Sequence, residues 1–274
     1  MLPKNLPTSR LHVYLFLTLL LLLLALGAPY LVPHDPYLQN LDNALQAPSG
    51  AYPLGTDRYG RCVFSRVLIG GQTSIFSTLA LVAIICSTGT LAGLWSGYYG
   101  GRLDSLFMRF ADIFLAFPGL VFAIAVASVL GDGITNAIVA LAVISWPKYA
   151  RLVRSQVLLV KQQPYIAAAR FSGCSDRQII INHILPSVFS PLLVMAALDL
   201  GTMLIELAGL SFLGLGAQPP AAEWGSMMNS GRSMLQTAPW VILAPGAAIF
   251  LTVSCFNLLS DSLRDQLDPK HNPK

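Results

Sequence analysis

Six long apolar blocks constrain the fold of this chain more than any other feature of its sequence. They lie at residues 13–32, 74–96, 110–130, 134–147, 185–210 and 240–259. Most approach the roughly 20 residues that a helix needs to cross a hydrocarbon core about 30 Å thick. Charged residues make up only 11% of the chain, less than half of the roughly 25% typical of soluble domains. The sequence therefore predicts an all-α, polytopic membrane protein with six transmembrane helices.

The basic residues are divided unevenly between the two faces that six such helices create. Cytoplasmic loops of membrane proteins carry an excess of Lys and Arg. Most of the basic residues fall on the face that contains the N-terminus, so this face and both termini are predicted to be cytoplasmic. That face has Lys4, Arg10, Arg102, Arg109, Lys148, Arg151, Arg154, Lys161, Arg170, Arg177, Arg264, Lys270 and Lys274, and the opposite face has Arg58, Arg61, Arg66 and Arg232.

The predicted helices divide the chain into four parts. Residues 1–32 form a cytoplasmic N-terminus with the first helix, 33–73 an extracytoplasmic segment, 74–260 a five-helix core, and 261–274 a cytoplasmic tail. A cleaved signal peptide is the alternative for the first block. An uncleaved helix is favoured, because the apolar run continues past the possible cleavage point before Pro29 and Leu26 occupies a position that requires a small residue.

A cytoplasmic loop at 148–183 reads as two short helices rather than a linker. Pro164 opens an alanine-rich helix, and Gly173 is placed to end it in the left-handed conformation. Ser175 and Gln178 have the spacing of a capping box that starts the second helix, and Pro186 marks the entry to the next span. Two interpretations remain open: an amphipathic hairpin on lipid headgroups, or a docking element for a cytoplasmic partner.

This loop resembles the "EAA" signature of binding-protein-dependent ABC importer permeases. In that family the segment forms coupling helices that lie in a cleft of the ATPase subunit. Ala167 stands where the signature has glutamate, which removes any salt bridge of that side chain but keeps helix propensity high. The resemblance implies that the ATPase-coupling residues are Tyr165, Ala167, Ala168, Ala169, Arg170, Gly173 and Pro186.

The resemblance extends along nearly the whole chain and is to the dipeptide, oligopeptide and nickel permeases. Within them the chain is most similar to the second, "C"-type permease, and to nickel or metallophore importers more than to peptide importers, which are the alternative. The motifs that carry it are Leu54-Gly55-Thr56-Asp57-Arg58-Tyr59-Gly60-Arg61, Gly100-Gly101-Arg102-Leu103-Asp104, Phe117-Pro118, Leu210-Ser211-Phe212-Leu213-Gly214, Glu223-Trp224-Gly225 and Leu267-Asp268-Pro269.

Membership of that family implies a set of partners and a location. The chain is expected in the bacterial inner membrane, in lipid contact, with a homologous permease, two ATP-binding subunits and an extracytoplasmic substrate-binding protein. ATP and Mg²⁺ are expected on the ATPases, with no cofactor, catalytic residue or metal site in this chain. The net charge of +4 is too small to indicate nucleic-acid binding.

Polar groups on an otherwise apolar helix are the candidates for the translocation pathway. Asp199 and Glu206 are seven residues apart and therefore lie on one face of the fifth predicted span, with Met203 near the same stripe. An intramembrane carboxylate costs several kcal/mol, so such groups face the bundle interior or water. They either line the pathway or are bound to the backbone or a neighbouring subunit, and Met203 is more simply explained by packing.

Three further local interpretations concern packing. Arg109 and Asp112 are spaced to pair along one helix, and Pro118 is placed to kink the third span. Gly89 and Gly93 allow close helix contact, within the subunit or across a dimer. Residues 214–240 are interpreted as an ordered external loop that helps meet the binding protein, with plain loop structure as the alternative.

Other protein classes fit the sequence less well. No Gly-Lys pair is present for a phosphate loop, so the chain is not itself the ATPase. A Gly-x-Ser-x-Gly nucleophile motif is missing as well. A secondary transporter is the better competitor, but that class shows inverted repeats and broken spans, and Pro118 is the one candidate break.

Overall fold

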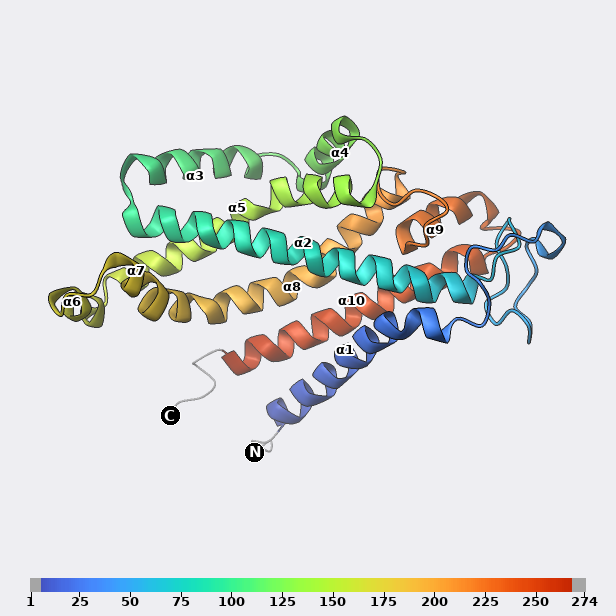
Figure 1. Ribbon diagram of the computed structural model, residues 1–274, viewed down its shortest axis with the longest axis horizontal. Helices are drawn as coiled ribbons and strands as arrows, with labels where there is room; N and C mark the ends of the chain where they lie inside the picture. Colours follow the sequence, from blue (N-terminus) through green and yellow to red (C-terminus); the bar gives the residue numbers. More distant parts are fainter. Residues whose placement is uncertain (1–5, 268–274) are drawn as a thin grey trace.

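The computed structural model describes residues 6–267, and all the regular elements in this range are helices (Figure 1). Lys4 and residues 268–274, which belong to the predicted cytoplasmic termini, lie outside the described residues. The longer helices are α1 (Leu6–Leu31), α2 (Val63–Tyr99), α3 (Gly101–Leu115), α4 (Gly119–Leu130), α5 (Ile134–Lys161), α8 (Leu185–Phe212) and α10 (Trp240–Leu267).

Four of the described helical stretches are long and apolar enough to cross a membrane, or five if α3 and α4 count together. The third predicted span is not one straight helix: α3 and α4 meet at 94°. Pro118 lies at the N-cap of α4 and has no N–H to continue the preceding helix, so the predicted kink is confirmed. The fourth predicted span continues as α5 to Lys161, and its apolar part is short because basic residues follow within the same helix.

α2 and α5 pack closely along a groove of glycines. A Cβ on Gly89 would lie 2.4 Å from the Cβ of Tyr149, and one on Gly93 would lie 2.6 Å from the carbonyl oxygen of Ala150. Gly97 continues the row one turn further and faces Val157. In lipid, where helices gain little from hydrophobic burial against one another, such close van der Waals contact drives association. The glycine contact predicted from the sequence is therefore made within the subunit.

The main core lies between α2, α5 and α8, and α1 and α10 form a second layer. Tyr149, Leu141 and Leu207 are among the fully buried side chains of the main core. Phe256 of α10 and Ala25 of α1 belong to a separate cluster. Many leucines of α1 remain exposed, as expected for a helix that faces lipid.

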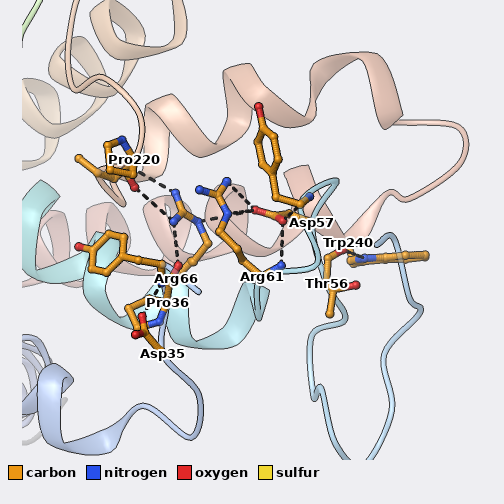
Figure 2. A network of polar contacts seen from close by, with 11 residues as sticks. Asp35, Pro36, Thr56, Asp57, Arg61, Arg66, Pro220 and Trp240 are labelled. Atoms are coloured by element: carbon orange, nitrogen blue, oxygen red, sulfur yellow. Dashed lines mark hydrogen bonds and ion pairs between the residues drawn. The ribbon is translucent and has the colours of Figure 1, made fainter. Parts of the chain in front are cut away.

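Polar contacts fix the segment between α1 and α2, and the loop after α8, to the first turn of α2 (Figure 2). Arg66, which is 5% exposed, donates from Nη1 to the carbonyl oxygen of Pro36 (3.0 Å) and to that of Pro220 (3.4 Å). Its Nε lies 3.9 Å from Asp57, which is paired at 2.7 Å with Arg61. A guanidinium with several fixed acceptors holds these segments together more firmly than a point charge does. We use the name outer cap for the end of the molecule that residues 33–66 and 214–240 form.

Residues 214–240 form the other part of the outer cap and contain α9 (Trp224–Gly231). Glu223 is the N-cap residue and accepts from the backbone N–H groups of Gly225 (2.9 Å) and Ser226 (2.8 Å). The Ser74 hydroxyl of α2 donates to the same carboxylate at 3.1 Å. Burial raises the pKa of the Glu223 carboxyl, and these donors oppose the rise. The prediction that this loop is ordered is confirmed.

Candidate functional site

The short helix α6 (Pro164–Phe171) projects at the end of the bundle opposite the outer cap (Figure 1). The N–H of Gly173 donates to Arg170 O (3.0 Å) and that of Cys174 to Ala169 O (3.1 Å), a Schellman pattern. Gly173 has a φ of +86°, a conformation that side chains with a Cβ adopt at a cost. The helix predicted from Pro164 and its glycine end are confirmed.

The second predicted short helix is not separate. The capping box of Ser175 and Gln178 is present and starts α7 (Asp176–Ile179). A π-helical turn, Ile180–Ile184, then leads directly into α8, so Pro186 lies inside a continuous helix. The wider turn precedes the proline, which has no N–H to give to the helix ladder. With α5 ending at Lys161, the projecting segment is shorter than the loop expected at 148–183.

α6 has one buried face and one exposed face. Ile166 is 2% exposed and packs into the main core. Phe171 follows five residues later, about 140° further round the helix, and is 93% exposed. An exposed aromatic ring on a helix of small residues is typical of an interaction surface. The predicted coupling residues Tyr165, Ala167, Ala168, Arg170 and Gly173 are exposed as well, and Ala169 is half-buried.

An ion pair joins α5 and α8 in the bundle. The Nζ of Lys148 lies 2.7 Å from Oδ2 of Asp199. The sequence assigned Lys148 to the cytoplasmic loop, but α5 continues through it and directs it toward α8. Asp112 likewise pairs with Arg151 of α5 and not with Arg109, because α3 packs against α5. Both carboxylates therefore find partners on another helix.

A half-open cleft of about 170 Å³ lies beside this ion pair. Lys148, Met203 and Glu206 line it, so two of the three predicted pathway residues face one space. Asp199 does not line the cleft, but it pairs with Lys148, which does. Met203 is buried, with its sulfur 4.0 Å from the hydroxyl oxygen of Ser145.

Aromatic rings at the α3–α4 break form one wall of the cleft. Phe114 and Phe117 line it. The ring of Phe122 is stacked on Phe114 with the centroids 5.8 Å apart, and lies 5.4 Å from that of Phe117. The break therefore places an apolar wall next to a charged lining, the combination typical of a ligand site.

A family model described as "Binding-protein-dependent transport system inner membrane component" matches residues 89–272. The chain belongs to this permease family. It is 46% identical over 254 residues to the glutathione transport system permease protein GsiD of Pectobacterium atrosepticum, and 48% identical to GsiD of Escherichia coli O6:K15:H31. Each alignment covers 92% of this chain and 84% of the relative.

The fold of the permease is similar to that of a solved importer. The structure titled as inward-facing conformations of the MetNI methionine ABC transporter matches with a TM-score of 0.54 and 20% identity, covering 71% of this chain and 94% of that one. The type I ABC importer permease fold expected from the sequence is thus confirmed. The chain is a multi-pass inner-membrane permease, a class that works with a second permease, ATPase subunits and a binding protein.

Two residues of the permease's candidate site were missed in the sequence. Lys148 was overlooked because its partner Asp199 lies on a different helix, and spacing along one helix cannot show such a pair. Phe171 could have been identified from the sequence, since its helical angle from Ile166 places it on the opposite face of α6. The coupling role of α6 and the pathway role of the cleft stay predictions.

Proposed function

We propose that this permease forms half of the translocation pathway of an ABC importer for short peptides such as glutathione. The observation that carries the proposal is the cleft, which presents an ammonium group on Lys148 and a carboxylate on Glu206. Glu206 suits the α-ammonium group of a peptide, and Lys148 can exchange Asp199 for a substrate carboxylate. The two GsiD relatives, named for glutathione transport, support peptides over the nickel or metallophore first expected.

The proposal assigns the α6 end to the cytoplasm. Most of the basic residues outside the outer cap belong to α3, α5 and α6, whereas Arg58, Arg61, Arg66 and Arg232 lie at the outer cap. This division supports cytoplasmic termini and places the exposed face of α6 toward the ATPases. ATP and Mg²⁺ bind to those subunits, and this chain supplies neither a cofactor site nor catalysis.

Uptake by the complete importer tests the substrate. The permease with its partner permease, ATPases and binding protein is reconstituted in liposomes that enclose ATP. We expect uptake of radiolabelled glutathione that requires ATP, and none of ⁶³Ni²⁺, alone or as a histidine chelate. ATP-driven nickel uptake without peptide uptake would contradict the proposed substrate. Ion-driven uptake by this chain alone would contradict the importer class.

The ion pair gives a prediction for the pathway. Asp199→Asn keeps the shape of the side chain but leaves the Lys148 ammonium without its counter-ion. We expect glutathione uptake to fall by at least about tenfold, roughly 1.4 kcal/mol, while the importer still assembles. Uptake and the subunit stoichiometry of the purified complex are measured together.

The charge-neutral double variant Lys148→Gln/Asp199→Asn is the matched control for the stability of the bundle. It removes the partly exposed Lys148 ammonium as well as the carboxylate, so any loss of thermal stability in Asp199→Asn should be reversed while uptake stays low. Wild-type uptake in Asp199→Asn would remove Asp199 from the pathway.

A further inference from the structure

Tyr98, in the last turn of α2, connects three other parts of the cytoplasmic end. Its hydroxyl lies 2.5 Å from Oδ1 of Asp176 in α7 and accepts from Nη2 of Arg170 in α6 at 3.3 Å. Its backbone carbonyl oxygen accepts from Nζ of Lys161, the last residue of α5, at 2.5 Å. One residue of α2 thus contacts α5, α6 and α7.

The ring of Tyr98 adds to these contacts. Lys161 Nζ lies 5.4 Å and the Arg170 guanidinium carbon 5.7 Å from the ring centroid, both within the range of cation–π attraction. Tyr98 is 3% exposed and belongs to the main core, together with Ile166 of α6 and Ile179 of α7. A hydroxyl in such a buried place is costly unless it is hydrogen-bonded, and here two charged partners surround it.

The position of Tyr98 determines how α6 is linked to the rest of the helix bundle. α6 is joined to α5 and α7 by short turns, and Ile166 fixes it to the core by apolar packing, which has little directional preference. The bond from Arg170 to the Tyr98 hydroxyl, in contrast, is charge-assisted and directional. This bond therefore links α6 to α2. The helix α2 packs against α5 along its row of glycines, and its other end is bound in the outer cap.

We propose that Tyr98 is a positioning residue that transmits the displacement of α6 to α2 when the ATPases close and open. The proposal rests on the proposed function, because it requires α6 to be the element that contacts the ATPases. Without the hydroxyl, α6 shifts relative to α2, and ATP is hydrolysed with less substrate moved. The residue acts through α6 and α2 and touches neither ATP nor substrate.

The test compares Tyr98→Phe with wild type in the complete reconstituted importer. The variant keeps the ring and its cation–π contacts and loses only the hydroxyl. We expect normal co-purification of the ATPases and a normal basal ATPase rate. The number of ATP molecules hydrolysed per substrate transported should rise about three- to tenfold, the range that one hydrogen bond supports.

Tyr99→Phe is the matched control, because Tyr99 is the next residue and is 54% exposed. It should leave the ATP-to-substrate ratio unchanged. Asp176→Ala removes the carboxylate on α7 that accepts from the Tyr98 hydroxyl and so helps to orient it toward Arg170. Asp176 is exposed, so this variant gives a second measurement if Tyr98→Phe does not fold. We expect it to raise the ratio as Tyr98→Phe does, and the double variant to be no worse than either single one. Asp176→Asn keeps an acceptor oxygen and should restore most of the coupling.

The outcomes separate this proposal from the proposed function. An unchanged ratio in both Tyr98→Phe and Asp176→Ala would overturn the role of Tyr98. Loss of ATPase co-purification in Tyr98→Phe would also overturn it, since the residue would then merely maintain the docking surface. If wild type shows no ATP-dependent uptake, the importer assignment itself fails, whatever the variants do.

Discussion

Replacing Gly93 with valine is expected to prevent the permease from accumulating as a folded protein. A Cβ at this position would lie 2.6 Å from the carbonyl oxygen of Ala150 and 2.7 Å from the Cβ of Val153. The first of these atoms is backbone, so α5 itself would have to move away from α2. Overpacking of this kind costs about 1–3 kcal/mol and more where the backbone must shift, a large part of a typical stability of about 5–15 kcal/mol.

The measurement is the yield and the thermal midpoint of the detergent-purified permease. Ala83→Val is the matched control, because Ala83 lies exposed on the same helix. We expect the control to behave as wild type and Gly93→Val to give little monodisperse protein. A Gly93→Val permease with the wild-type midpoint would show that α2 and α5 do not pack as described.

Phe171→Glu is expected to weaken the association of the permease with its ATPases strongly while leaving the permease folded. The side chain is 93% exposed in the permease, so its replacement removes no contact within the chain. If α6 lies in an ATPase cleft, the ring is an aromatic anchor, and the change buries an unpaired carboxylate in its place. Anchors of this kind contribute at least about 2 kcal/mol, which corresponds to a loss of affinity of more than about thirtyfold.

Binding is measured by titrating the purified ATPase onto the permease pair in nanodiscs. Gln162→Glu places the same charge in the exposed turn before α6 and is the matched control. We expect it to bind within a few-fold of wild type. Equal binding by Phe171→Glu would exclude the exposed face of α6 as the docking surface.

Local features of the fold were predictable because their causes are local. The end of α6 depends on Gly173, and the start of α7 depends on the Ser175–Gln178 capping box, each determined within a few residues. The kink at Pro118 follows from a missing N–H. In contrast, the 94° angle there reflects the packing of α4 against α5, which no short stretch of sequence specifies.

Contacts between helices were harder to predict than the helices themselves. Asp112 was assigned to Arg109, its nearest basic residue along the helix, whereas Arg151 reaches it across the α3–α5 contact. Asp199 was recognised as a costly charge, but its partner Lys148 was not, because the end of the fourth span was placed too early. The cleft was harder still to predict, since its lining comes from three separate parts of the chain.

The length of α2 has a consequence for how the two sides of the membrane communicate. Its 37 residues extend for about 55 Å, well beyond a hydrocarbon core of about 30 Å. Arg66 is bound in the outer cap near one end of α2, and Tyr98 contacts α6 and α7 near the other. Because α2 is one continuous helix, it connects these two sets of contacts directly. Thermodynamic reciprocity applies to two sites connected in this way. If the binding protein changes the affinity of the ATPases for nucleotide, nucleotide must change the affinity of the importer for the binding protein by the same factor.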